Sequence, residues 1–124
     1  MKIGILGGSF DPVHTGHIEL AKRALRVGLE KVIFMPTGIQ PFKCDNTPAA
    51  DADRIAMLEI AVAGIPEFEI SRHEIDREGL SYTIYTLRAM RELYVGAEIF
   101  FIIGIDAFLD IQKWMYAEEL LREF

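Results

Sequence analysis

Apolar residues follow two spacings along this chain, and each spacing predicts a different element. The run Ile3-Gly4-Ile5-Leu6 is short and almost entirely apolar, as expected of a central parallel strand that is buried on both faces. Soon afterwards Ile18, Ala21 and Leu25 recur at helical spacing, with charged residues on the other positions. This part of the sequence predicts a strand followed by an amphipathic helix that begins near Thr15.

The same two spacings repeat to the end of the chain. Strands are predicted over residues 2–6, 31–35, 68–71 and 98–103, and helices over residues 15–27, 51–63, 83–94 and from Trp114 onward. Between Thr37 and about Pro48 the composition shifts to Pro, Gly, Asn and Thr, which predicts a long loop of the kind that often carries function. Alternating strands and helices indicate an α/β fold, with a doubly wound parallel sheet covered on both faces.

The junction between the first strand and the first helix holds the most specific motif, GGSFDPVHTGH over residues 7–17. Gly7 and Gly8 lack a Cβ, so the backbone there can turn sharply, approach a ligand closely and direct its next amides at an anion. The N–H groups and positive dipole end of the following helix favour phosphate at the same point. His14 and His17 lie three residues apart and face the same side of the helix start. The motif predicts a phosphate site with two imidazole donors.

Two other interpretations of this motif fit the residues less well. The motif lacks the Lys-Ser or Lys-Thr of a Walker A loop and the spacing of a dinucleotide-binding GxGxxG. A zinc site would need a third ligand, and Cys44 and His73 stand in no metal-binding pattern, so no metal site is predicted. For either histidine alone a plainer interpretation stays open, in which His14 and His17 only make local hydrogen bonds at a helix start.

Composition narrows the class of protein. A chain of 124 residues with 51% hydrophobic content predicts one domain with a real core, over residues 1–124. The net charge of −6 disfavours a nucleic-acid partner held by a broad basic surface. A single cysteine excludes an internal disulfide, and no segment has the apolar length of a signal peptide or a membrane span. We therefore expect a cytoplasmic protein that binds neither nucleic acid nor membranes.

The stretch GGSFDPVHTGH resembles the HxGH signature of a nucleotidyltransferase superfamily, which transfers an adenylyl or cytidylyl group from a nucleoside triphosphate to a phosphate. Residues 36–43, 77–87 (REGLSYTIYTL) and 102–114 (IIGIDAFLDIQKW) extend the resemblance and make the chain similar to bacterial nicotinate mononucleotide adenylyltransferases. The resemblance implies a Rossmann-like sheet of strand order 3-2-1-4-5, which binds ligands at its switch point. It also implies adenylyl transfer from ATP, with Mg²⁺, to nicotinate mononucleotide, forming deamido-NAD and pyrophosphate.

The resemblance also assigns roles to individual residues. His14 and His17 would be catalytic, with His17 at the reacting phosphate. The residues expected to bind ATP and its phosphates are Gly7, Gly8, Ser9, Phe10, Lys43, Gly104 and Asp106, and those expected to bind the pyridine nucleotide are Tyr82, Thr83 and Trp114. On the residues alone, Lys43 is equally well a solvated lysine, Asp106 a turn cap and Trp114 a core residue. Arg54 is expected to be a surface or structural charge.

The chain departs from the family pattern in two places. Phe42 stands where the family commonly has a histidine before Lys43. Family chains also continue into a further parallel strand and a Ser/Thr-rich ISxTxIR segment, whereas this sequence ends at Phe124 within a predicted helix. These departures predict a fragment without the last strand and the C-terminal helices. We expect its apolar strand over residues 98–103 to form an edge, and the chain to form homo-oligomers.

Two other functions stay open on the sequence. One is another adenylyltransferase of the superfamily, such as phosphopantetheine adenylyltransferase, although SYTIYTL and Trp114 favour the pyridine-nucleotide branch. The other is a module that binds a mononucleotide without transferring any group. The separate roles of His14 and His17, and the preference for nicotinate or nicotinamide mononucleotide, also stay open.

Overall fold

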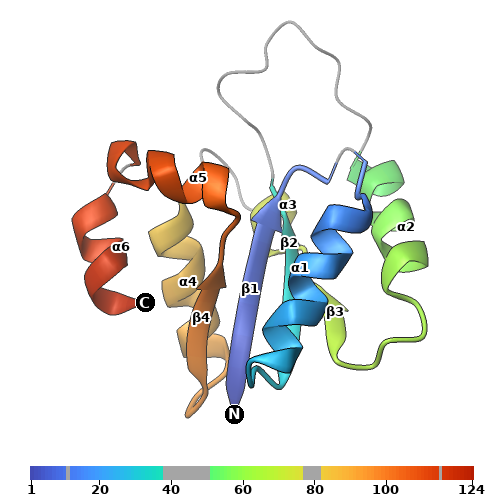
Figure 1. Ribbon diagram of the computed structural model, residues 1–124, viewed down its shortest axis with the longest axis horizontal. Coiled ribbons are helices and arrows are strands. Elements are labelled where there is room, and N and C mark those ends of the chain that lie inside the picture. Colours follow the sequence, from blue (N-terminus) through green and yellow to red (C-terminus); the bar gives the residue numbers. More distant parts are fainter. Residues whose placement is uncertain (11, 38–50, 77–81, 115) are drawn as a thin grey trace, which may run out of the picture.

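The computed structural model describes residues 1–10, 12–37, 51–76, 82–114 and 116–124 (Figure 1). Its centre is a sheet of four parallel strands in the order β3-β2-β1-β4, formed by β1 (Lys2–Gly8), β2 (Lys31–Pro36), β3 (Phe68–Ile70) and β4 (Glu98–Ile102). All four lie where the sequence predicts strands. The order confirms a doubly wound fold, because β1 pairs with β2 on one side and with the distant β4 on the other.

Helices connect the strands: α1 (Thr15–Arg26), α2 (Asp51–Val62), α3 (His73–Asp76), α4 (Thr83–Leu93), α5 (Ile105–Asp110), the 3-10 turn η1 (Ile111–Lys113) and α6 (Ala117–Glu123). Helices α1, α2 and α4 match the predicted helices closely. The sequence does not predict α3 or α5, whose four and six residues are too few to show a helical period. None of the described helices has the length and apolar character needed to cross a membrane.

The helix expected from Trp114 onward is wrong at its start. Trp114 has an extended backbone (φ −76°, ψ 150°) and ends η1 instead of opening a helix. The following helix, α6, begins only at Ala117, after Tyr116 in a left-handed conformation (φ 61°, ψ 32°). The physical reason is tertiary: the Trp114 ring packs edge-on against Phe101 of β4, with ring centroids 5.8 Å apart, and the chain turns at Tyr116 afterwards.

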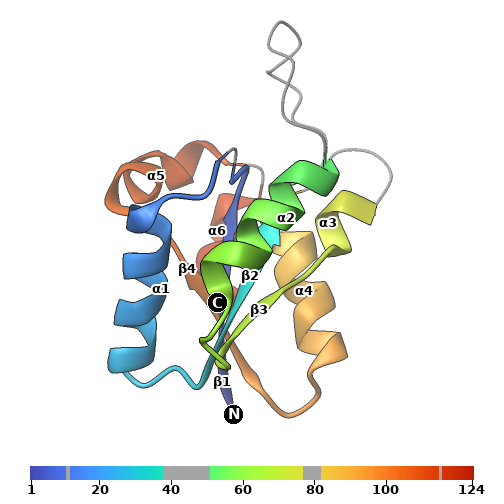
Figure 2. The same cartoon turned by 90° about the vertical axis from the view of Figure 1, so that its right-hand side faces the viewer.

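Helices cover both faces of the sheet, so the molecule has three layers; Figure 2 shows α1 and α4 on opposite sides of the strands. The alternation of side chains along β1 divides the core accordingly. Ile3 and Ile5 pack in the cluster that contains Leu87 of α4, whereas Leu6 packs in the cluster that contains Ala21 of α1. A strand with apolar neighbours on both faces has no polar face, which is why it appears in the sequence as a continuous apolar run.

The carboxyl ends of the four parallel strands meet at one edge of the sheet. There β1 ends at Gly8 and leads to α1 on one face, and the neighbouring β4 ends at Ile102 next to the start of α4 on the other face. Adjacent strands that serve opposite faces leave a crevice between their ends, which is where open α/β sheets bind ligands. The topology therefore places a candidate site beyond β1 and β4.

Candidate functional site

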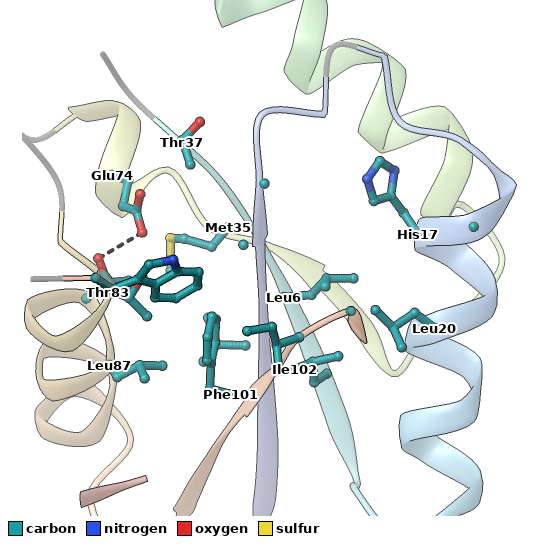
Figure 3. A pocket seen from close by; sticks show the side chains of 18 of the residues that line it. Leu6, His17, Leu20, Met35, Thr37, Glu74, Thr83, Leu87, Phe101 and Ile102 are labelled. Atoms are coloured by element: carbon teal, nitrogen blue, oxygen red, sulfur yellow. Dashed lines mark hydrogen bonds between the residues drawn. The ribbon is translucent and has the colours of Figure 1, made fainter. Parts of the chain in front are cut away.

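A cavity of about 650 Å³ lies beyond the ends of β1 and β4. Figure 3 shows His17 and Leu20 of α1 to one side of β1, and Glu74, Thr83 and Leu87 to the other. The remaining lining residues are Ile5, Leu6, Gly7, Gly8, His14, Gly16, Met35, Thr37, Thr86, Phe101, Ile102, Ile103, Gly104 and Trp114. A mainly apolar cavity with a few converging polar groups is typical of a small-molecule site.

Two histidines cap the start of α1. The Nδ1 atom of His14 accepts a hydrogen bond from the Gly16 N–H at 3.1 Å, and the Nδ1 atom of His17 accepts one from the His14 N–H at 3.0 Å. The bonds satisfy amides that a helix start leaves unpaired. Since each Nδ1 is an acceptor, each neutral ring carries its proton on Nε2. Local hydrogen bonding and ligand binding are therefore compatible, because the caps fix the rings and orient an Nε2–H donor on each.

Gly16 makes this arrangement of imidazoles possible. A Cβ at Gly16 would lie 2.9 Å from Cε1 and 3.0 Å from Nδ1 of His14, so a side chain there would push the ring away. With that space left open, the His14 and His17 rings stack, with centroids 3.8 Å apart and planes 27° apart. Three-residue spacing and an intervening glycine together produce the histidine pair.

Burial of the His17 ring, and to a smaller extent the nearby His14, hold the pKa of His17 below its ordinary value of 6.5. Burial disfavours the charged imidazolium, and a second proton on His14 would repel it further. Phe10 covers part of the ring, packing edge-on against His17 with centroids 4.8 Å apart. At neutral pH His17 is therefore a neutral hydrogen-bond donor.

The turn between β1 and α1 is supported from inside the molecule. Phe10 has a left-handed backbone (φ 47°), and its ring is buried, with an exposed fraction of 1%. This conformation costs about 1–2 kcal/mol in a residue with a Cβ, and burial of a phenylalanine ring offsets it by a similar amount. Arg54 of α2 reaches the same turn, where its Nη1 donates to the Ser9 carbonyl oxygen at 2.9 Å. Of the two roles that the sequence allows for Arg54, the structural one is confirmed, since the residue is only 5% exposed.

The start of α4 forms the opposite wall of the cavity. Tyr82 is its N-cap residue, with an extended backbone (φ −111°, ψ 138°) and no side-chain capping hydrogen bond. Thr83, the first residue of the helix, lines the cavity, as does Trp114. The first N–H groups of a helix have no partner within it and favour an anion at that end. This wall is suited to a ligand that carries a negatively charged group.

Glu74 is a cavity residue that the sequence does not single out. It lies on α3, is 7% exposed, and its Oε2 accepts a hydrogen bond from Thr86 Oγ1 at 2.8 Å, drawn as a dashed line in Figure 3. Its neighbour Asp76 on the same helix is exposed. A helix of four residues is too short for a pattern of buried and exposed positions to appear, so no sequence signal separates the two carboxylates.

The structure brings most of the predicted site residues to one cavity. Those that line it are Gly7, Gly8, His14, His17, Thr83, Gly104 and Trp114. Ser9 and Phe10 belong to the turn after β1, and Tyr82 precedes α4. Asp106 is the second residue of α5, directly after Gly104 and Ile105. Lys43 lies outside the described residues.

The Cytidylyltransferase-like family model matches residues 5–124. The chain belongs to the cytidylyltransferase-like family. The match runs from β1 to the last residue of the chain, so it includes both walls of the cavity as well as the glycine turn. It confirms the resemblance to nucleotidyltransferases that the motif GGSFDPVHTGH indicates.

Curated relatives of this cytidylyltransferase-like chain include two bacterial proteins named "Probable nicotinate-nucleotide adenylyltransferase". The protein of Synechococcus sp. (strain JA-3-3Ab) is 45% identical over 122 residues, which are 98% of this chain and 59% of the relative. The protein of Moorella thermoacetica (strain ATCC 39073 / JCM 9320) is 48% identical over 126 residues, which are 98% of this chain and 57% of the relative. The chain therefore spans less than two thirds of the length of these relatives.

Solved structures share the fold of this cytidylyltransferase-like chain. A protein from Vibrio parahaemolyticus superposes with a TM-score of 0.83 at 24% identity, covering 100% of this chain and 71% of that one. The nicotinic acid mononucleotide adenylyltransferase of Plasmodium falciparum, complexed with NaAD, superposes with a TM-score of 0.81 at 20% identity, covering 96% of this chain and 59% of that one. At these identities the likeness shows the fold.

Proposed function

We propose that this chain carries the site of a nicotinate mononucleotide adenylyltransferase. It would transfer the adenylyl group of ATP to nicotinate mononucleotide and form deamido-NAD and pyrophosphate in NAD biosynthesis. The observation that carries the proposal is a single cavity that joins the paired histidines at the start of α1 to the start of α4. The names of the curated relatives support the same reaction.

The reaction needs positioning and charge stabilisation from the protein. An oxygen of the acceptor phosphate attacks the α-phosphorus of ATP and forms a new P–O bond, while the bond to the bridging oxygen breaks and its electron pair leaves with pyrophosphate. No protein nucleophile takes part. The Nε2–H groups of His14 and His17 would donate to phosphate oxygens that gain negative charge, and the positive end of the α1 dipole would add to this stabilisation.

The two walls of the cavity would hold different substrates. On the α1 side, the backbone from Gly7 to Phe10 would approach the triphosphate, with Lys43 as a further phosphate contact and Gly104 and Asp106 near the adenosine. On the α4 side, amides near Tyr82 and Thr83 would bind the nicotinate carboxylate, and Trp114 would stack on the pyridine ring. The acceptor phosphate would then reach the α-phosphorus across the end of β1.

Magnesium would enter this site on the triphosphate of ATP. Among the described residues, no three His, Cys, Asp or Glu side chains converge on a point that could hold a metal ion. Mg²⁺ commonly keeps several waters and binds through substrate phosphates, so a protein cage is not required. The donors that line the α1 wall, imidazole Nε2–H and backbone N–H, suit the phosphates, and Mg²⁺ when bound would neutralise part of their charge.

We also propose that the chain is a cytoplasmic homo-oligomer with no nucleic-acid or membrane partner. Within the described sheet β4 pairs only with β1, and Phe100 on this edge strand is 37% exposed. An apolar strand edge favours association with a second copy. The single cysteine supports a cytoplasmic location, and the net charge of −6 disfavours a nucleic-acid partner. That none of the described helices could cross a membrane supports the remaining part.

The deciding experiment is pyrophosphate release by the 124-residue chain with Mg-ATP and each of three acceptors. Nicotinate mononucleotide is expected to be used in preference to nicotinamide mononucleotide and phosphopantetheine. His17→Ala should lower the rate by about 10²–10³-fold, as does the loss of a donor to a developing charge. Lys22→Ala is the matched control, since Lys22 is exposed on the same helix and does not line this cavity.

The other outcomes identify the alternatives. Release with phosphopantetheine instead would indicate a different adenylyltransferase of the superfamily. Binding of ATP or nicotinate mononucleotide to folded protein without any release would contradict the transfer activity and leave a mononucleotide-binding module.

A further inference from the structure

The hydrogen bond between Glu74 and Thr86 joins two elements of the cavity and has no role in the reaction described above. Both residues line the cavity, and both are buried, with exposed fractions of 7% and 1%. The bond links α3 to α4 and joins two residues that are 12 positions apart in the chain. The 2.8 Å distance is typical of an O–H···O hydrogen bond, and a buried polar group that loses its partner is destabilising, so this contact is a firm one.

Thr86 has a local alternative to this bond. A threonine inside a helix can donate to the carbonyl of the residue four positions earlier, here Tyr82. That carbonyl accepts the backbone N–H groups of Tyr85 and Thr86, at 3.1 and 3.2 Å. The Thr86 hydroxyl instead reaches across to Glu74 at 2.8 Å. Burying a carboxyl group is unfavourable unless it gains partners, and the Thr86 hydroxyl is one of the partners of Glu74.

The bond acts on the part of α4 that forms the cavity wall. Thr86 lies three residues after Thr83, so the two side chains share one face of the helix, and both line the cavity. Tyr82 gives the helix start no side-chain cap, so the direction of the first turn depends on contacts further along. The single turn of α3 is too short to be stable by itself and is fixed by packing.

We propose that Glu74 is a positioning residue for the acceptor substrate: through Thr86 it sets the orientation of the first turn of α4, and with it the affinity for nicotinate mononucleotide. This inference rests on the proposed function for the identity of the ligand. It predicts that the α1 wall is unaffected, because Figure 3 shows His17 across β1 from Glu74 and Thr83.

Calorimetric titration of the full chain with nicotinate mononucleotide and, separately, Mg-ATP tests the inference. Thr86→Val keeps the shape and removes the donor, and should weaken nicotinate mononucleotide binding about tenfold, the equivalent of one such hydrogen bond, with ATP affinity within about twofold. Thr86→Ser and Glu74→Gln keep a donor and an acceptor and should retain most of the affinity. Glu92→Gln is the control for loss of a carboxylate charge, because Glu92 is exposed and lies on α4, the helix of Thr86.

Amide hydrogen exchange gives a second measurement that needs no ligand. The N–H groups of the first turn of α4 should exchange faster in Thr86→Val than in the parent chain, and at the parent rate in Thr86→Ser. If Thr86→Val does not fold, Glu74→Ala makes the same comparison from the α3 side.

The outcomes separate this inference from the proposed function. Unchanged exchange in Thr86→Val, equal weakening of both ligands, or an unchanged affinity for nicotinate mononucleotide overturns the positioning role. Failure of the parent chain itself to bind nicotinate mononucleotide contradicts the proposed function, and with it the ligand named here.

Discussion

At the start of α1, the hydrogen bonds that cap the helix also decide where each imidazole keeps its proton. Nδ1 of both His14 and His17 accepts a backbone N–H, so protonation of either ring at Nδ1 would break a cap. The pKa of His17 is held low by burial and by His14, which favours the same neutral state. A change of pH that protonates an imidazole thus weakens the cap of α1 and at the same time turns the neutral Nε2–H donor into a charged one.

The pKa of His17 should depend on His14 in a predictable direction. His14→Asn keeps a good N-cap side chain and removes the neighbouring charge, so the pKa of His17 should rise while staying below 6.5, because burial is the larger cause of the shift. NMR titration of the imidazole resonances measures it. A fall in the His17 pKa in this variant would contradict the assignment of causes.

The lowered pKa of His17 also sets the sign of its effect on stability. As the pH falls below 6.5, His17 takes up a proton in the unfolded chain before it does so in the folded chain. Protonation of His17 therefore lowers the free energy of unfolding. The effect is absent above that pH, and it grows until the folded-state pKa is passed.

Gly16→Ala should separate stability from ligand binding. Alanine is favoured over glycine in a helix by up to about 1 kcal/mol, and loss of the His14 cap costs a similar amount, so the free energy of unfolding should change little. The displaced imidazole should nevertheless weaken Mg-ATP binding by at least about tenfold, as for loss of a hydrogen bond to a charged group. Urea unfolding and calorimetry measure the two quantities. Unweakened ATP binding would show that the position of His14 does not matter.

Among the elements, those with long apolar patterns are the ones that the sequence predicts well. β1, α1 and α4 show a buried run or a repeated apolar stripe, and their bounds follow from it. The elements α3 and α5 depend on tertiary contacts, and their local sequence carries no period. The helical spacing after Trp114 predicts that it opens a helix, but in the structure Trp114 packs against Phe101 and ends η1.

Helix α2 contributes to the site through Arg54, whose hydrogen bond to the Ser9 carbonyl oxygen anchors the glycine turn. Arg54→Met should therefore lower the free energy of unfolding by about 1–3 kcal/mol, the penalty for leaving a partly buried acceptor unsatisfied. Urea unfolding measures the change. Arg26→Met is the matched control, since Arg26 is exposed on α1 and should change stability by at most about 0.5 kcal/mol. Equal changes in the free energy of unfolding for the two variants would contradict the structural role of Arg54.

In the whole molecule, the site combines a part that the sequence reveals and a part that it does not. The α1 wall follows from one contiguous motif, residues 7–17, so its histidines and glycines can be predicted directly. The α4 wall comes from three segments that are separate in the sequence: α3, the start of α4, and Trp114 after η1. The fold brings them together near the end of β1. The resemblance predicts Thr83 and Trp114, which line the cavity, whereas no sequence signal indicates Glu74, because only the fold shows that it is buried.

The position of β4 at the edge of the described sheet gives a prediction about the proposed self-association of the chain. Phe100→Lys places a charge on the outer strand β4 and should shift a self-associating chain toward monomer. Sedimentation velocity over a range of concentrations measures the change. Phe108→Lys is the matched control, because Phe108 is 50% exposed but lies on the helix α5 and not on a strand. A parent chain that stays monomeric at every concentration would contradict the homo-oligomer.

The pairing of β1 with β4 has a consequence for how the chain is made. Lys2 pairs with Glu98 and Leu6 with Ile102, so one side of β1 waits for its neighbour until about 100 residues have been synthesised. At the usual rates of translation that interval is roughly 5–20 s. During this interval β1, the strand that leads into the glycine turn, is an open apolar edge on a nascent chain. The segment that organises the finished site is thus open to misassembly during synthesis, and a chaperone that shields this strand would protect it.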